Sequence, residues 1–248
     1  MSDSFKEKEE KIRRYPNFLS RYYFEDKIDR EEKIKNFYTA IPTNSIVLEG
    51  ACGKISKIKN YNVDNSNIRI LIGVDLLENA LRINNSLDFK IVANLENLPF
   101  KRNYFDVVDL PAVVEHLQDP EKVFKEVEYV LKKGGVLLIA TQNIYHPIMN
   151  IQRLLPLKIR YWIKKNILKN QGHYLDTFPA PYQCNSPMKI KKTLTNLGFK
   201  EEQIWLSGLP LMSTPAICLF FSMIYEKLTD KRWLRIFKSN LRVRFRKI

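Results

Sequence analysis

The sequence predicts an α/β fold: a doubly wound, mostly parallel sheet with helices on both faces, followed by an extra helical C-terminal region. Short apolar runs alternate with helical patterns over residues 45–141, which is typical of parallel strands joined by crossover helices. The runs are nearly continuous in apolar residues, as expected for strands that are covered on both faces. A chain of 248 residues is long enough to bury one large core of this kind.

The expected elements follow the chain in order. Strands are expected at residues 45–49, 70–74, 89–92, 104–110, 136–140 and 199–206, and helices at 1–25, 29–40, 55–60, 77–84, 145–170 and 186–197. A further helix is expected to begin at Asp119-Pro120, an N-cap before a proline, and to end at Gly134-Gly135. We see no clear strand after Leu206. The basic tail from Lys227 is expected to be an exposed amphipathic helix or a segment that contacts an anionic surface.

Two of the expected strands end in residues that suit a nucleoside ligand. The run at residues 45–49 passes directly into the small residues 50–53, where the backbone can approach a ligand closely. The next run ends in Asp75, and an acidic residue about 20–25 positions on is placed to bind the two hydroxyls of a ribose. The sequence therefore predicts a nucleoside-containing ligand at the carboxyl edge of the sheet.

Composition narrows the class of protein. The formal net charge of +14 favours an anionic partner (nucleic acid, acidic lipid or a phosphorylated substrate), unless the charge is spread over a solvated surface. Cys52, Cys184 and Cys218 are too far apart to indicate a disulfide framework or a metal site. The charged N-terminus has no secretory pattern, so we expect a cytoplasmic protein. The uncharged stretch 204–225 is long enough to span a bilayer, but its prolines favour a strand, a loop and a short buried helix.

An ordered set of motifs resembles a known family. The set comprises Asn94–Phe100, Tyr104–Val108, Val114-Glu115-His116-Leu117, Asp119-Pro120 and Leu131–Gly135. In order and spacing it is similar to the core of the class I S-adenosylmethionine-dependent methyltransferases, the Rossmann-like enzymes of the methyltransferase type 11 group that act on small molecules, sugars and lipids. The resemblance covers about residues 46–141. It implies S-adenosyl-L-methionine as the cofactor and no metal.

The resemblance implies cofactor roles for nine residues. Asp75 would bind the ribose hydroxyls, and Asn94 would accept a hydrogen bond from the adenine amino group. Leu76 and Leu95 would sandwich the adenine ring. Glu49 would act on the methionine end through the loop and water. The remaining residues of the expected cofactor site are Gly50, Ala51 and Gly53 in the loop, and Leu110.

The small-residue loop departs from the family pattern of three glycines. The three positions here read Ala51, Gly53 and Ile55, with an extra Gly50. The loop therefore either takes a slightly different path, or binds the cofactor weakly or not at all.

The resemblance also implies an organisation of the whole chain. We expect an N-terminal helical cap over residues 1–42, a cofactor-binding core over 43–142, and an acceptor pocket with a basic tail over 143–248, packed with the core as one domain. The segment 173–179, with Tyr182 and 185–187 after it, resembles a region of bacterial members tied to cell-envelope glycan genes. His173 with Asp176 is the expected catalytic pair, and His146 is a further candidate base. His116 is a less favoured one.

Three functions stay open at this point. The first is methyl transfer to an oxygen or nitrogen of a small molecule, a sugar or a lipid-linked glycan, with peripheral contact of the basic tail to an anionic membrane. The second is methylation of RNA, which the charge suits although no Asn-Pro-Pro-Tyr-type motif follows the fourth strand and no RNA-binding module is appended. The third is a non-catalytic binding protein with an altered cofactor loop.

Overall fold

The computed structural model describes residues 10, 12–13, 16–39, 41–60, 67–156, 158–159, 162, 166, 180–208 and 216–248. By contacts the chain divides into two compact units. We call Lys33–Asn143, Ala180–Trp205 and Leu241–Ile248 the sheet unit, and Met1–Glu32, Ile144–Pro179 and Leu206–Asn240 the helical unit. The division at residues 42 and 142 that the sequence predicts stays a prediction.

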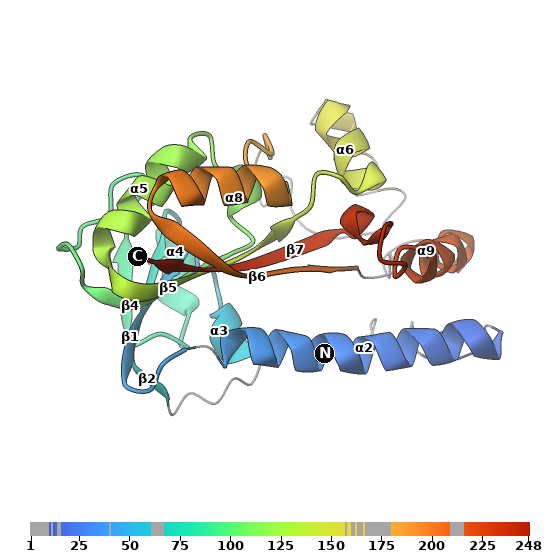
Figure 1. Ribbon diagram of the computed structural model, residues 1–248, viewed down its shortest axis with the longest axis horizontal. Helices are drawn as coiled ribbons and strands as arrows, with labels where there is room; N and C mark the ends of the chain where they lie inside the picture. Colours follow the sequence, from blue (N-terminus) through green and yellow to red (C-terminus); the bar gives the residue numbers. More distant parts are fainter. Residues whose placement is uncertain are drawn as a thin grey trace. The chain divides into compact units, whose positions relative to one another are not determined.

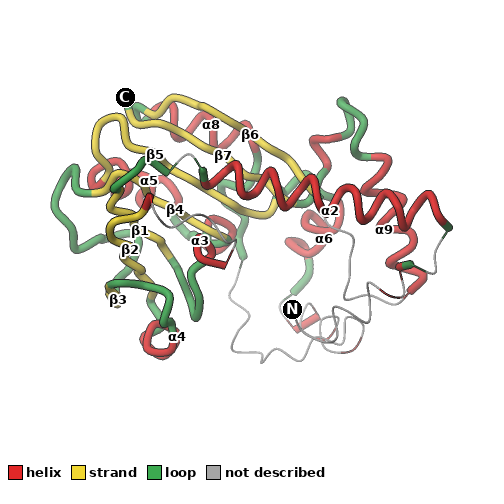
Figure 2. Tube along the Cα trace, turned by 90° about the horizontal axis from the view of Figure 1, so that it is seen from below, coloured by secondary structure: helices red, strands yellow, loops and turns green. Residues whose placement is uncertain are grey.

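The described strands form one seven-stranded sheet in the order β3-β2-β1-β4-β5-β7-β6. β1 pairs in parallel with β2 and β4, β2 with β3, and β4 with β5. Figure 2 shows β3 and β6 at opposite edges of the sheet. The strands are β1 (Ser45–Gly50), β2 (Ile68–Asp75), β3 (Phe89–Val92), β4 (Phe105–Pro111), β5 (Leu131–Gln142), β6 (Phe199–Ser207) and β7 (Asn240–Lys247). The predicted doubly wound, mostly parallel sheet is confirmed.

β7 corrects the interpretation of the basic tail. The amide of Ile248 donates to the carbonyl of Gly198 (3.0 Å), and Lys247 Nζ donates to the carbonyl of Leu131 (2.9 Å). The end of β7 therefore lies beside the beginnings of β6 and β5, so β7 runs opposite to both (Figure 1). The expectation of an exposed helix, with no strand after Leu206, is wrong for residues 240–247.

The alternation of side chains explains why these residues form a strand. Leu241, Val243 and Phe245 are fully buried, and basic residues stand between them. A period of two residues is the pattern of a strand with one apolar face. Three of the basic residues form ion pairs within the sheet unit: Arg244 and Arg246 with Glu202, and Lys247 with Glu128. Arg242 lies over the ring of Trp205, 5.0 Å from its centroid.

The α5–β5 boundary differs from the prediction. α5 (Pro120–Val130) begins as expected, with the Asp119 carboxylate accepting from the amide of Lys122 (3.1 Å). It ends at Val130 rather than at Gly134, because β5 already begins at Leu131. Gly134 has φ +73° within β5, where the register against β4 shifts. The glycine pair thus lies in an irregular stretch of β5, where β5 advances from Leu131 to Val136 while β4 advances from Phe105 to Val107, and not at the helix end.

The remaining described helices are mostly short. They are α2 (Asn17–Tyr38), α3 (Lys57–Asn60), α4 (Glu78–Ile83), α6 (Pro147–Leu154), α8 (Pro187–Asn196), α9 (Ala216–Leu228) and the 3₁₀ turns η2 (Val114–His116) and η4 (Arg235–Phe237). α2 joins the end of the helix expected over 1–25 to most of the helix expected over 29–40. The single helix expected over 145–170 is wrong at its centre, because α6 ends at Leu154 and neither Leu155 nor Pro156 is helical; much of the rest lies outside the described residues. None of the helices formed by the described residues is long and apolar enough to cross a membrane.

Helices cover both faces of the sheet. On one face, Phe37 and Tyr38 at the end of α2 and Ile58 of α3 pack against apolar strand residues that include Val47 and Val107. Figure 1 shows α5 and α8 on the side of the strands opposite to α3. The buried residues of these two helices are Val123, Phe124, Val127, Val130, Ile190 and Leu194. The sheet is therefore rigid at its centre, where β1 and β4 lie.

Candidate functional site

The candidate site lies at the carboxyl ends of β1, β2 and β4. The strand order reverses between β1 and β4, since the chain goes outward from β1 to β3 and then returns to β4 on the other side. In open parallel sheets, ligands bind in the crevice at such a switch point. The residues that leave these three strands are the ones that the sequence assigns to the cofactor.

Asp75 fastens the loop after β1 to the end of β2. Its Oδ2 accepts from the amide of Gly53 (2.8 Å) and its Oδ1 accepts from the amide of Leu77 (2.8 Å). The amide of Cys52 also donates to the carbonyl of Val74 (3.2 Å). We call this arrangement the Asp75 clamp. A carboxylate offers about four acceptor positions, so both oxygens can still accept from ribose hydroxyls.

Gly50 lies against two leucines that belong to the predicted site. A Cβ atom on Gly50 would lie 2.7 Å from Leu110 Cδ2 and 2.9 Å from Leu95 Cδ2, which is closer than real contacts of this kind. Both leucines are buried. The structure thus brings Gly50, Leu95 and Leu110 together, and a larger residue at position 50 would have to displace the ends of both leucine side chains.

Two residues of the loop have a left-handed backbone. Ala51 has φ +52° and Gly53 has φ +57°, so alanine occupies the left-handed conformation that glycine would adopt without strain. The side chain of Ile55 is 49% exposed. Replacing glycine by isoleucine at this position therefore buries no bulky side chain inside the loop.

Ala51→Gly is expected to raise the free energy of unfolding by about 0.5–1 kcal/mol, because glycine relieves the strained backbone and only part of the gain is lost to its greater freedom in the unfolded chain. Denaturant titration measures the change. The control is Ala80→Gly in α4, which is expected to lower stability by about 1 kcal/mol. A loss of stability in both variants would contradict the strained loop.

Glu49 is hydrogen-bonded to the end of the loop that follows β1. Its buried carboxylate accepts from the Ser56 hydroxyl and from the amide of Lys57 (2.7 Å). Burial raises the pKa of Glu49 to about 7. Asp109 is its register partner on β4, and burial, together with the Glu49 carboxylate, raises the pKa of Asp109 well above its ordinary value. Glu49 therefore holds the end of the loop in place and is not a free anion at the surface.

The residues expected around the adenine lie after β2 and β3. Leu76 is 65% exposed, whereas Leu95 is buried beside Gly50. Asn94 Oδ1 accepts from the amide of Glu96 (2.9 Å), and a carbonyl oxygen can accept a second hydrogen bond. The role of these residues in binding adenine stays a prediction.

A buried polar cluster beside this site had no role in the sequence prediction. Thr141 Oγ1 donates to Glu115 Oε2 (2.6 Å), and Asn185 Nδ2 donates to Thr141 Oγ1 (2.6 Å). Tyr182 donates from its amide to the carbonyl of Glu115 (3.3 Å) and from its hydroxyl to Gln142 Oε1 (2.6 Å). We call these residues the Glu115 cluster. Asn185 Oδ1 is buried and has no hydrogen-bond partner within the described chain.

The position of the cluster in the chain is a signal that sequence reasoning can use. Glu115 comes directly after β4, and Thr141 lies at the end of β5. Polar residues at the carboxyl ends of neighbouring parallel strands come together at one edge. The contribution of Tyr182 and Asn185 depends on tertiary contacts and is not visible in the local pattern.

The expected catalytic residues are not brought together by the described structure. His173 and Asp176 lie outside the described residues. His146 lies in the helical unit, where its ring packs edge-on against Tyr225. Burial lowers the pKa of His146 to about 4. Within the part of the chain that the structure describes, no three acidic, histidine or cysteine side chains are grouped to hold a metal ion.

Comparison with known proteins leads to the same family that the sequence motifs resemble, the methyltransferases. A family model described as a methyltransferase domain matches residues 48–139. A crystal structure of an S-adenosylmethionine-dependent methyltransferase from Mesorhizobium loti has a TM-score of 0.56 at 14% identity, covering 88% of this chain and 97% of that one. A methyltransferase structure from Methanosarcina mazei has a TM-score of 0.56 at 16% identity, covering 86% and 97%.

Curated relatives match only part of their length. An uncharacterized protein of Methanocaldococcus jannaschii is 29% identical over 127 residues, which are 51% of this chain and 58% of that protein. The ubiquinone/menaquinone biosynthesis C-methyltransferase UbiE of Paraburkholderia xenovorans is 26% identical over 85 residues, or 34% of this chain and 35% of that protein. The chain thus spans less than two thirds of these relatives. Together with the sheet order, these matches show that residues 48–139 resemble a methyltransferase domain and that the chain has the fold of the S-adenosylmethionine-dependent methyltransferases.

Proposed function

We propose that the chain transfers the methyl group of S-adenosylmethionine to a hydroxyl or amino group of a small molecule, a sugar or a lipid-linked glycan. The observation that carries the proposal is the Asp75 clamp, which places a carboxylate with spare acceptor capacity at the switch point of the sheet. The loop supports it, because Ala51 and Gly53 both adopt the left-handed backbone conformation that glycine favours.

The residues present fit the cofactor. The Asp75 carboxylate suits a pair of ribose hydroxyls, and the loop backbone is open at Gly53, where a Cβ atom would meet nothing within 4 Å. S-adenosylmethionine, when bound, supplies a methyl group that the positive charge on its sulfur already activates. The protein has to hold the acceptor atom near that methyl in the right orientation, and such positioning contributes several orders of magnitude in rate.

We assign the acceptor side of the site to the Glu115 cluster. It lies at the ends of β4 and β5, next to the strand that carries the cofactor loop. Its unpartnered group, Asn185 Oδ1, is a hydrogen-bond acceptor. A hydroxyl or an amino group donates a hydrogen bond to such an oxygen, which supports an acceptor of that chemistry.

A hydroxyl or amino acceptor also has to lose a proton around the transfer step. His173 with Asp176 remains the proposed pair for this task. His146 is the alternative: its Nδ1 is buried with no hydrogen-bond partner within the described chain, although burial lowers its pKa to about 4 and so makes it a weak base at neutral pH. Turnover rates of His173→Ala and His146→Ala at saturating cofactor decide which of the two histidines accepts the proton.

Transfer of labelled methyl tests the function. The protein is incubated with methyl-labelled S-adenosylmethionine and, separately, with phosphorylated sugars, lipid-linked sugar intermediates and structured RNA. Label in a hydroxyl-bearing or amino-bearing sugar or lipid supports the proposal. Label in RNA alone would contradict it and favour the second function that the sequence leaves open.

Asn185→Ala is expected to raise the KM for the methylated acceptor about 10-fold or more, because the variant loses an acceptor for the substrate and a donor to Thr141. Affinity for S-adenosylhomocysteine should stay within about 2-fold, since no Asp75 contact changes. The control is Asn196→Ala, at the exposed end of α8. An unchanged KM in a folded Asn185→Ala protein would remove the cluster from the acceptor site.

A further inference from the structure

The segment between α9 and β7 exposes aromatic and basic side chains together. Trp233 is 74% exposed, Ile236 38% and Phe237 40%. Lys231, Arg232 and Arg235 are exposed in the same seven residues. We call residues 231–237 the basic turn. Single exposed apolar residues are common, but three within one short turn form a patch of the kind that marks an interaction surface.

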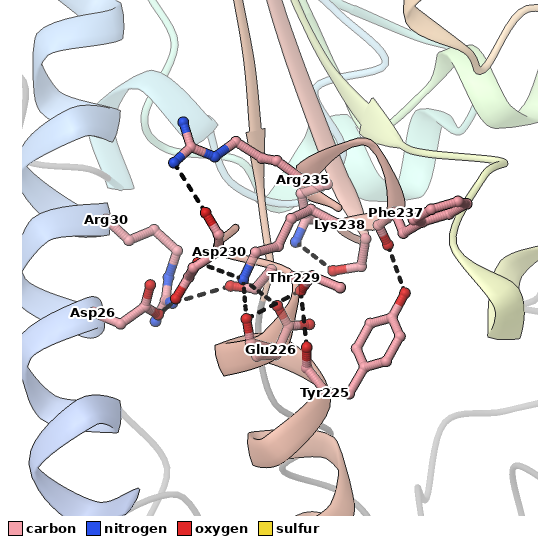
Figure 3. A network of polar contacts seen from close by, with 12 residues as sticks. Asp26, Arg30, Tyr225, Glu226, Thr229, Asp230, Arg235, Phe237 and Lys238 are labelled. Carbon is pink, nitrogen blue, oxygen red and sulfur yellow. Dashed lines mark hydrogen bonds and ion pairs between the residues drawn. The ribbon is translucent and has the colours of Figure 1, made fainter. Parts of the chain in front are cut away.

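A buried ion pair anchors the end of the basic turn. Lys238 Nζ lies 2.9 Å from Glu226 Oε2 and 2.8 Å from Asp230 Oδ1, and it donates to the carbonyl of Glu226 (2.6 Å). The side chains of Lys238 and Glu226 are each only 4% exposed. Figure 3 shows Lys238 reaching back to α9 through these contacts. A charged pair at this depth is costly unless it is fully bonded, so it fixes the backbone on both sides of the turn.

Further hydrogen bonds hold the turn along its length. The hydroxyl of Tyr225 donates to the carbonyl of Phe237 (2.8 Å), and Thr229 Oγ1 donates to the carbonyls of Tyr225 (2.9 Å) and Glu226 (3.0 Å). Arg235 donates to the carbonyl of Asp230 (3.3 Å). These bonds appear as dashed lines in Figure 3. The fold therefore fixes the backbone of the turn and leaves its apolar side chains in solvent.

A second layer of contacts supports the anchor from α2. Arg30 pairs with Asp26 and donates to the carbonyl of Gly208 (3.0 Å). A Cβ atom on Gly208 would lie 1.6 Å from Glu226 Oε2, so the backbone packs directly on the carboxylate. The basic turn thus rests on a packed polar core within the helical unit.

We propose that the basic turn docks on an anionic membrane surface, with Trp233, Ile236 and Phe237 entering the headgroup region and Lys231, Arg232 and Arg235 contacting acidic lipids. Tryptophan and phenylalanine favour this interfacial depth, and each basic residue adds attraction to an anionic leaflet. The net charge of +14 also attracts the protein to an anionic membrane. Arg244, Arg246 and Lys247 of β7 are paired with acidic residues inside the sheet unit, so these three residues are less suited than the basic turn to bind lipid.

Sedimentation with lipid vesicles tests the proposal on the full chain. We expect binding to vesicles of equal parts phosphatidylcholine and phosphatidylglycerol, and at least about 10-fold weaker binding to phosphatidylcholine alone. Added salt should weaken binding to the anionic vesicles and leave binding to phosphatidylcholine vesicles unchanged, because salt screens only the contacts between charges. Equal binding to both kinds of vesicle would overturn the proposal.

Variants identify the turn as the contact. Lys231→Glu with Arg232→Glu, and separately Trp233→Ala, are each expected to weaken binding to the anionic vesicles about 10-fold or more. The matched controls are Lys192→Glu on α8 and Tyr129→Ala on α5, both exposed in the sheet unit. They should bind as the wild type does. Equal binding of all variants, or loss in the controls as well, would overturn the assignment to the turn.

Fluorescence locates the tryptophan. Brominated lipids quench tryptophan emission only at close range, so quenching should fall in Trp233→Phe while vesicle binding is largely kept. Full quenching in that variant would show that another tryptophan enters the membrane. Binding of single-stranded RNA that the same charge reversals abolish, without binding to vesicles, would replace the membrane by a nucleic-acid partner.

Discussion

Asp75→Ala is expected to lower the affinity for S-adenosylhomocysteine about 100-fold or more. The carboxylate accepts from the amides of Gly53 and Leu77, and it is the group proposed to bind the ribose hydroxyls. Hydrogen bonds to a charged group contribute about 1.5–3 kcal/mol each, so losing two of them accounts for that change. Isothermal titration calorimetry of the folded variant measures it.

Asp88→Ala is the matched control. Asp88 Oδ2 also accepts a backbone amide, that of Leu71 (2.7 Å), but Asp88 comes just before β3 and belongs to no predicted cofactor position. The two variants lose similar structural bonds, so only Asp75→Ala should lose the ligand. Wild-type affinity in Asp75→Ala would refute the placement of the ribose.

Lys238→Met is expected to lower the free energy of unfolding by about 3–5 kcal/mol at neutral pH, the largest stability effect that we anticipate. The variant leaves Glu226 buried without its partner, and breaking a buried pair on one side costs about this much. Denaturant titration measures the loss. Lys191→Met removes a more exposed pair with Glu201 (2.9 Å) and should cost less than about 1 kcal/mol.

Two further measurements show whether the stability loss of Lys238→Met comes from the unpaired charge of Glu226 or from lost packing. Lys238→Met combined with Glu226→Leu should recover much of the loss, because the buried charge is removed and the other partner of Lys238, Asp230, is 43% exposed. Burial raises the pKa of Glu226 above 4.5. A raised pKa means that stability is fully present below the unfolded value and is lost as the pH rises through the folded one, so the deficit of Lys238→Met should shrink in acid. A deficit that is independent of pH and unrelieved in the double variant would argue for packing alone.

Local sequence patterns were sufficient to predict the central strands of the sheet and to propose the cofactor site at their carboxyl ends. The strands β1, β2, β4 and β5 are continuous apolar runs that any buried parallel strand requires, and Asp119-Pro120 is a start signal read from two adjacent residues. Asp75 follows from its place at the end of such a run. These assignments needed no knowledge of distant contacts.

Other features depend on tertiary contacts. β7 joins the sheet between β5 and β6 although it comes last in the chain, and its arginines resemble a solvated tail until Glu202 and Glu128 are seen beside them. The same holds for Asn185, whose side chain reaches Thr141 across the sheet unit, and for Lys238, whose burial no local pattern indicates. The sequence shows that a side chain is basic, but it does not show whether that side chain is buried, ion-paired or exposed to solvent.

Calorimetric titration of the wild-type protein with S-adenosylhomocysteine tests the central claim most directly, since the claim is that the carboxyl edge of the sheet still binds the cofactor with Ala51 and Ile55 in its loop. The structure predicts saturable binding at one site per chain. A folded protein that shows no binding would contradict the account and favour a methyltransferase fold retained for binding alone.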